Sequence, residues 1–218
     1  MNNLMNFVGF PKIARLRRQI VVTEKIDGTN AQVNIRVACE AEGKYNPRYD
    51  HPYLDEKGDE PVLYYVRAGS RVRWICPDDD NFGFARWVWD NTPELVELGP
   101  GAHFGEWWGS KIQRGYGLSG PLGRRFSLFN VGRWTEENKP IVCDVVPTLY
   151  TGTFDLQAVD ACLEWLHTIG SAAKPGYMNP EGIILYHTDS HTMYKQTLDN
   201  DRPKNTMPIV NKGKKLEA

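Results

Sequence analysis

The sequence predicts an α+β domain built on antiparallel sheets, and three observations lead to this class. Short apolar or alternating segments recur along the whole chain, as is typical of strands, whereas only residues 155–169 have the pattern of a long helix. Strands do not alternate regularly with helices, which argues against a parallel, doubly wound fold. The 218 residues, 41% of them hydrophobic, suit one domain with a sizeable core. We therefore expect a single domain over residues 1–218, without a separate C-terminal domain.

The expected elements follow in order along the chain. Strand character is found at residues 20–23, 30–37, 62–66, 103–107, 126–131, 141–146, 181–186 and 193–198. Residues 40–61 are polar and read as a long surface excursion, and residues 84–89 suggest a short helix that ends before Pro93. In the long helix, one apolar face is expected to be formed by Leu156, Val159, Leu163 and Leu166, with Gly170 as the stop.

Composition excludes several classes of protein. The formal net charge is −1, so the chain is not a general polyanion binder, and any contact with nucleic acid has to be local. No apolar run approaches the roughly 20 residues that span a bilayer, so we expect no membrane association. The four cysteines lack a CxxC pair, which argues against a zinc site and a disulfide framework and favours the reducing cytoplasm. They are Cys39, Cys76, Cys143 and Cys162.

One short segment concentrates reactive chemistry. Lys25-Ile26-Asp27-Gly28-Thr29-Asn30 follows the apolar run at residues 20–22 and places an amine, a carboxylate and a flexible turn together. A lysine attacks phosphorus only as the free amine, which requires partial desolvation or suitable neighbours. Glycine lets the backbone approach a phosphate where a Cβ would clash. Taken alone, the same residues favour a surface hairpin in which Asp-Gly makes the turn and Lys25 is solvated.

Four later segments carry the groups that such a lysine would need. Glu106 lies at the end of an expected strand, and the aromatic residues of 126–131 are suited to stacking on a base. Glu181 precedes a buried strand and Lys195 follows it. Magnesium favours carboxylate oxygen, retained water and substrate phosphate, and a second lysine would neutralise phosphate charge. Each residue also has an ordinary alternative: a solvated edge carboxylate, a core aromatic or a surface cation.

In this order the segments resemble the collinear motifs of the covalent nucleotidyltransferases, which are the polynucleotide ligases and messenger-RNA capping enzymes. The RNA ligase 2 type, which includes phage and RNA-editing ligases, is the most similar, and the resemblance spans roughly residues 7–200. The matching segments are Glu24 to Asn30 (motif I), Ser70-Arg71 (the following arginine motif), Phe104-Gly105-Glu106 (motif III), Phe129-Asn130-Val131 (motif IIIa), Glu181-Gly182 (motif IV) and Lys195 (motif V).

The resemblance implies a ligase-type adenylation domain, with antiparallel sheets flanked by helices and the nucleotide site between them. It implies an ATP-dependent RNA ligase that joins 5′-phosphate and 3′-hydroxyl ends through a lysine-AMP intermediate on Lys25, with Mg²⁺ or alternatively Mn²⁺. The implied partners are RNA ends, in a nicked duplex or an RNA–DNA hybrid, in a pathway such as RNA repair.

Roles carry over residue by residue. Glu181 would organise the metal and Lys195 would grip the α-phosphate. The implied cofactor-binding residues are Glu24 and Ile26 beside the nucleophile, Asn30 at the phosphate, Arg71 and Glu106 at the ribose or incoming phosphate, and Phe129 on adenine.

Two departures from the family pattern matter. Motif V usually has two lysines separated by one residue, whereas Lys195 has Met193 and Thr197 at those distances, so its register stays open. Lys111 or Lys204 are candidates for the missing phosphate contact. Few residues follow Lys195, so a partner protein is a candidate source of nick binding. A DNA ligase, a capping-type guanylyltransferase and a non-catalytic module that binds nucleotides or nucleic-acid ends remain alternatives.

Overall fold

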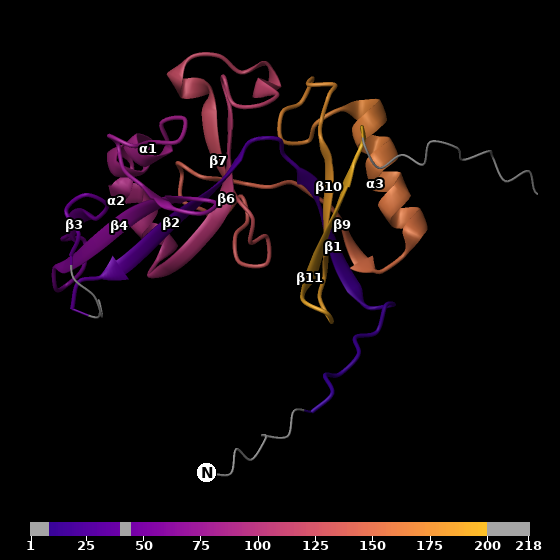
Figure 1. Cartoon of the computed structure of the whole chain (residues 1–218), viewed down its shortest axis with the longest axis horizontal. Coiled ribbons are helices and arrows are strands. Elements are labelled where there is room, and N and C mark those ends of the chain that lie inside the picture. The colour runs from indigo at the N-terminus through magenta and orange to yellow at the C-terminus, as the bar shows by residue number, and fades with distance from the viewer. Residues whose placement is uncertain (1–8, 40–44, 200–218) are drawn as a thin grey trace, which may run out of the picture.

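The computed structural model describes residues 9–39 and 45–199, which form two β-sheets that lie in separate lobes (Figure 1). The smaller sheet has the strand order β11-β10-β1-β9, and all its pairs are antiparallel. Its strands are β1 (Gln19–Lys25), β9 (Thr148–Thr153), β10 (Gly182–His187) and β11 (Thr192–Thr197). The α+β class with antiparallel sheets and few helices is therefore confirmed.

The larger, seven-stranded sheet has the order β3-β4-β2-β6-β7-β8, with β5 paired to β4. Only the β7–β8 pair is parallel among the described strands. The strands are β2 (Thr29–Val37), β3 (His51–Asp55), β4 (Val62–Ser70), β5 (Trp74–Ile75), β6 (Gly101–Gly109), β7 (Arg124–Leu128) and β8 (Asp144–Val145). The short helices on this lobe are α1 (Phe84–Asp90), α2 (Thr92–Leu95), η1 (Val96–Leu98), η2 (Gly115–Gly117) and η3 (Pro121–Gly123).

Each lobe has its own hydrophobic core. In the smaller lobe, alternate residues of β1 and β10 pack against α3 (Leu156–Ile169), whose side chain Leu166 is fully buried. Asp155 caps this helix by accepting a hydrogen bond from the backbone N–H of Gln157. In the larger lobe, the apolar face of β2 packs with α1 and with the aromatic side chains of Trp107 and Phe126. The polar positions of both sheets are thereby left on the opposite faces.

A third, smaller cluster joins the two lobes. It consists of Ile26, Trp108, Tyr116 and Val146, all of them buried. The chain crosses between the lobes at the turn from β1 to β2, directly beside this cluster (Figure 1). The lysine segment of the sequence therefore lies at the junction of the lobes.

Several expectations about elements are wrong. Residues 40–61 were expected to form a surface excursion, and residues 40–44 lie outside the described part of the chain, but residues 51–55 form β3. This is an edge strand, where Pro52 is tolerated although it has no N–H to donate to a ladder. Only two residues of the expected strand at 141–146 pair as a strand, and β9 follows where none was expected. Leu156 is 65% exposed and does not join the buried face of α3. No helix in the part of the chain that the structure describes is long and apolar enough to cross a membrane.

Candidate active site

The amine of Lys25 is paired with the carboxylate of Glu181. Lys25 is the last residue of β1 and lies opposite Gly182, so the register of β1 and β10 brings Glu181 beside it. Nζ of Lys25 donates to Oε2 of Glu181, and the two side chains are 22% and 17% exposed. The amine is thus partly desolvated, held by one carboxylate and still reachable from solvent.

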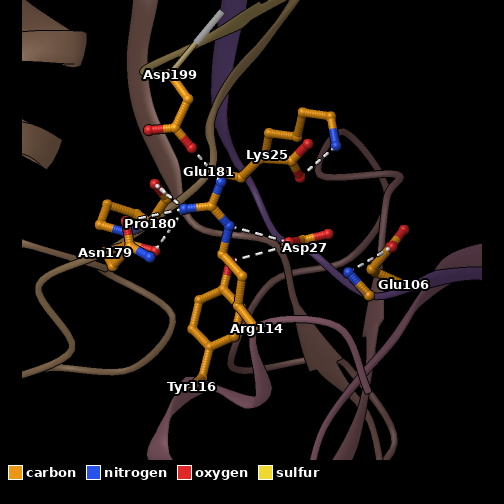
Figure 2. A network of polar contacts seen from close by, with 10 residues as sticks. Lys25, Asp27, Glu106, Arg114, Tyr116, Asn179, Pro180, Glu181 and Asp199 are labelled. Atoms are coloured by element: carbon orange, nitrogen blue, oxygen red, sulfur yellow. Dashed lines mark hydrogen bonds and ion pairs between the residues drawn. The ribbon is translucent and has the colours of Figure 1, made fainter.

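Glu106 approaches the same junction from the other sheet. It lies on β6 opposite Asn30 of β2, and one of its oxygens accepts a hydrogen bond from the backbone N–H of Gly28 at 3.1 Å (Figure 2). Burial raises the pKa of the Glu106 carboxyl to about 7, and the charges of Glu181 and Asp27 act in the same direction. The positive charge of Lys25 and the Gly28 hydrogen bond oppose this rise. Near neutral pH, Glu106 therefore exchanges between a hydrogen-bond donor and an acceptor.

The turn between Lys25 and β2 has no space for a side chain at Gly28. A Cβ built there would lie 2.5 Å from the carbonyl oxygen of Trp107 and 2.7 Å from Cβ of Trp108. Both contacts are far shorter than atoms tolerate, and both involve groups that cannot swing away. Glycine is needed because the turn lies directly on β6, and this contact is what brings Glu106 within reach of the turn.

Asn30 and Phe129 lie on the same face of the larger sheet as Glu106. Asn30 is its direct partner on β2, and Ser127 is its partner on β7. Phe129 lies two residues beyond Ser127, so alternation places its side chain on this face as well. Its backbone N–H continues the sheet by donating to the carbonyl of Phe104, and its side chain is 37% exposed. Phe129 is therefore accessible for stacking at the junction side of the sheet.

Arg71 follows Ser70, the last residue of β4, which pairs with Ala31 of β2. Arg71 is exposed, and its side chain makes no hydrogen bond or ion pair within residues 9–39 and 45–199. The strand register thus places it near the β2 end that carries Asn30, with its guanidinium open to a ligand.

Lys195 shares a face with Lys25 on the smaller sheet. It lies opposite Ile184 of β10, whose neighbours Ile183 and Leu185 pack in the core with α3. Ile184 and Lys195 consequently face the other way, as Lys25 does. Met193 and Thr197 alternate onto the same face, so both registers of Lys195 in motif V stay open. Lys204 lies outside the described residues, and Lys111 lies in the loop after β6 with a φ of 63°.

Glu24 and Ile26, both predicted to bind the cofactor, have buried side chains. Glu24 is 1% exposed and accepts hydrogen bonds from the hydroxyl of Ser171 and from the backbone N–H groups of Ala172 and Ala173. Burial raises the pKa of the Glu24 carboxyl, and these hydrogen bonds oppose the rise. Ile26 is 4% exposed within the junction cluster. Only backbone atoms of these two residues are therefore available to a nucleotide.

The sequence assigned no specific role to Arg114 or Tyr116, although both touch the lysine turn. The guanidinium of Arg114 donates to the carboxylate of Asp27 at 3.0 Å, and the Tyr116 hydroxyl accepts the backbone N–H of Asp27 at 2.9 Å. Figure 2 shows Arg114 at the centre of a polar network beside the Lys25–Glu181 pair. In the sequence, the only signal for Arg114 is that it belongs to a group of four basic residues, Lys111, Arg114, Arg124 and Arg125.

The donor set at the junction suits a hydrated metal ion. The described residues contain no group of three or more His, Cys, Asp or Glu side chains arranged to hold a metal. Carboxylates of Glu181, Glu106 and Asp27 nevertheless surround the turn. Mg²⁺ keeps several waters and binds through one or two carboxylates and substrate phosphates, so these residues fit it without a full protein cage.

Two mainly antiparallel sheets, with the Lys25–Glu181 pair at their junction, agree with the class of covalent nucleotidyltransferases that the sequence motifs resemble. Within this class, the model of the RNA ligase family matches residues 18–204, and the chain belongs to that family. No curated protein sequence matches significantly.

Solved structures of the Naegleria gruberi RNA ligase are similar in fold. A mutant with AMP and Mn has 17% sequence identity and a TM-score of 0.50, and the match covers 84% of this chain and 50% of that one. Another mutant, with ATP and Mn, has 16% identity, a TM-score of 0.48 and the same coverage. This chain thus spans about half the length of those solved chains.

Proposed function

We propose that this chain carries the adenylating site of an ATP-dependent RNA ligase, with Lys25 as the nucleophile. The observation that carries the proposal is the Lys25 amine at the end of β1, paired with Glu181 and facing the junction that Glu106 enters from the other sheet. Family membership supports the same reaction class. A nucleophile at the meeting point of two lobes can be reached by a nucleotide that lies between them.

The first step is adenylation of Lys25. Nζ attacks the α-phosphorus of ATP, an N–P bond forms, the P–O bond to the β-phosphate breaks, and pyrophosphate leaves. An oxygen of a 5′-phosphate then attacks the phosphorus of the bound AMP, a P–O–P bond forms and the N–P bond to Lys25 breaks. A 3′-hydroxyl finally attacks the 5′-phosphate, loses its proton and expels AMP. Nζ has to lose its proton before it attacks. Glu181 is hydrogen-bonded to Nζ and is therefore the carboxylate positioned to accept that proton.

The other residues are proposed to bind the nucleotide. Ionised Glu106 would accept a hydrogen bond from a ribose hydroxyl, and Phe129 would stack on adenine. Asn30 and Arg71 would contact phosphate or ribose from the larger sheet. Lys195, on the face shared with Lys25, would neutralise charge on the α-phosphate. Glu24 and Ile26 would contribute backbone contacts only.

Magnesium, or manganese in its place, is proposed as the metal cofactor. When bound, it would neutralise phosphate charge, and Glu181 would hold it through its water shell. The proposed role of the protein residues is to orient the ATP phosphates and to keep Lys25 aligned with the phosphorus.

We further propose that the substrates are RNA ends, in a nicked duplex or an RNA–DNA hybrid, and that residues 1–218 act as one nucleotidyltransferase unit. A partner protein is proposed to supply nick binding. A cytoplasmic location is supported by the four cysteines, all of which are free thiols.

The decisive experiment is incubation with α-³²P-labelled ATP and Mg²⁺, followed by denaturing electrophoresis. We expect an acid-labile covalent AMP adduct that is absent from Lys25→Ala. The lack of any adduct in the wild type, or its persistence in Lys25→Ala, would refute the proposal. Labelling by GTP instead would indicate a capping-type enzyme, and binding of ATP without an adduct would indicate a non-catalytic module. Sealing of matched ends with ribose or deoxyribose at the 3′-hydroxyl separates RNA from DNA ligation.

A further inference from the structure

Arg114 connects three segments that meet at the junction of the lobes. It lies in the loop after β6, which belongs to the larger lobe, and its side chain is 19% exposed. Nε donates to Oδ2 of Asp27 at 3.0 Å, and Nη2 donates to Oδ2 of Asp199. Nη1 donates to the Oδ1 of Asn179 at 2.9 Å and lies 3.2 and 3.4 Å from the carbonyl oxygens of Asn179 and Pro180. All three nitrogens of one guanidinium are therefore engaged (Figure 2).

These partners flank the proposed reacting groups. Asp27 lies two residues after Lys25, and Pro180 directly precedes Glu181. Asp199 lies just beyond β11, the strand that carries Lys195. Arg114 thus touches the segments that hold the nucleophile, its carboxylate partner and the second lysine, without touching any of these three groups itself.

The loop around Arg114 is held in an unfavourable conformation. Lys111, Gln113 and Tyr116 have φ values of 63°, 44° and 51°, and they are three of the five non-glycine residues with positive φ in the described part of the chain. Each such residue costs about 1–3 kcal/mol and persists only where its surroundings enforce it. Here the enforcing contacts are the burial of Ile112 in the larger core and of Tyr116 in the junction cluster.

The two buried residues lie on either side of Arg114 in the chain. Tyr116 packs edge-on against Trp108, with ring centroids 4.9 Å apart, and makes a tilted ring contact with Tyr177 of the opposite lobe, with centroids 4.5 Å apart. The loop cannot relax without exposing one of these anchors. It therefore presents the guanidinium to the smaller lobe from a fixed base, which costs little further ordering entropy.

We propose that Arg114 is a positioning residue for the adenylation of Lys25, an inference that rests on the proposed function. Its planar fork fixes the turn that carries Lys25 relative to the segment that carries Glu181. A lysine at this position keeps the charge, but its single ammonium cannot reach all three segments at once. Loss of the guanidinium allows the lobes to shift, and displacement of about 1 Å at a reacting centre costs on the order of 100-fold in rate.

The test compares Arg114→Ala and Arg114→Lys with the wild type and with Arg124→Ala. Arg124 is a matched control because its guanidinium also donates to backbone carbonyls, those of Phe82 and Ser110, but only within the larger lobe. We expect both Arg114 variants to form the Lys25 adduct about 10–100-fold more slowly at saturating ATP, with the KM for ATP changed less than about threefold. Free guanidinium ion at millimolar concentration should restore part of the rate to Arg114→Ala. Arg124→Ala should react within about threefold of the wild type.

A double-mutant cycle tests whether Arg114 affects the adenylation rate through its contact with Asp27. If Arg114 acts through Asp27, the rate loss of Arg114→Ala combined with Asp27→Asn should be smaller than the product of the two single losses. A wild-type rate in Arg114→Ala, a loss confined to KM, or an equal loss in Arg124→Ala would overturn the inference. If Arg114→Ala does not fold, as judged by its melting curve, Arg114→Lys decides by the same criteria.

A second readout does not depend on ATP. The rate of reductive methylation of Lys25 by formaldehyde and cyanoborohydride, followed by peptide mass spectrometry, reports how firmly its amine is held against Glu181. We expect this rate to rise at least about threefold in Arg114→Ala and to stay unchanged in Arg124→Ala. A wild type without an adduct refutes the proposed function, whereas equal methylation in wild type and Arg114→Ala refutes the positioning role.

Discussion

Replacement of Glu106 by glutamine should stabilise the folded protein at alkaline pH. The pKa of this carboxyl is raised from 4.5 to about 7 by its burial at the junction, so its ionised form is disfavoured in the folded state. At about 1.36 kcal/mol per pH unit, the difference corresponds to a cost of about 3 kcal/mol once Glu106 is ionised in both states. The cost is smaller to the extent that water reaches the carboxylate. Glutamine is neutral and still offers an oxygen to the N–H of Gly28.

The direction of the pH dependence of stability follows from the proton that the folded state holds on Glu106. Between pH 4.5 and 7 the folded state holds a proton on Glu106 that the unfolded state has lost, so its contribution to stability falls as the pH rises through this range. Below pH 4.5 both states are protonated and glutamine brings no advantage. We therefore expect Glu106→Gln to exceed the wild type in unfolding free energy by about 3 kcal/mol at pH 8 and by nearly nothing at pH 4.

The assay is urea unfolding of both proteins at half-unit pH steps from 4 to 8. The difference between the two proteins removes the contributions of other titrating groups. Glu56→Gln serves as the control for the loss of an exposed carboxylate far from the junction in sequence, and its unfolding free energy at pH 8 should lie within about 0.5 kcal/mol of the wild type. A Glu106→Gln difference that is flat with pH, or a variant that is less stable than the wild type at pH 8, would refute the reasoning.

Three further outcomes are expected. Gly28→Ala should lower the unfolding free energy by about 2 kcal/mol or more and abolish the adduct, because its Cβ has no room beside Trp107; thermal melting and the adduct assay check this. Glu24→Ala should lower the unfolding free energy in urea by about 3 kcal/mol, since one buried and two partly buried donors lose their acceptor; an effect below about 1 kcal/mol would contradict it. Lys195→Met should slow adduct formation about 100-fold without changing the melting temperature, because this exposed side chain is proposed to act only on phosphate.

The sequence predicted the elements whose patterns are local. The long helix appears within one residue of its expected bounds, with its stop at Gly170 and with Val159 and Leu166 buried, although Leu156 of the expected apolar face is exposed. The strands on both sides of the lysine turn were also recognised, because both have clear hydrophobic patterns. By contrast, β3 and β9 lie at sheet edges, where one side of the strand has no partner and polar residues are tolerated. Their weak patterns explain why neither was predicted.

The candidate site was predictable only in part, for a related reason. Lys25, Glu106 and Glu181 were identified because residue type and order suffice to match a family. Arg114 was not identified, because it binds residues that are distant in the sequence. Its partners Asp27, Asn179 and Asp199 lie 87, 65 and 85 residues away. The burial of the Glu24 side chain could not be predicted for the same reason. The groups that donate hydrogen bonds to it, at residues 171–173, have no distinctive sequence pattern.

The lysine turn has a separate physical constraint at each of its four positions. Lys25 ends a strand of the smaller lobe, whereas the next three residues are tied to or packed against the larger one. Ile26 is buried in the junction cluster. The N–H of Asp27 donates to the hydroxyl of Tyr116, and its carboxylate accepts from Arg114. Gly28 donates its N–H to Glu106, and there is no room for a Cβ at this position. The position of the Lys25 amine relative to groups of the larger lobe, such as Glu106, is therefore set by the relative position of the two lobes. Any contact that fixes this position acts on the nucleophile without touching it.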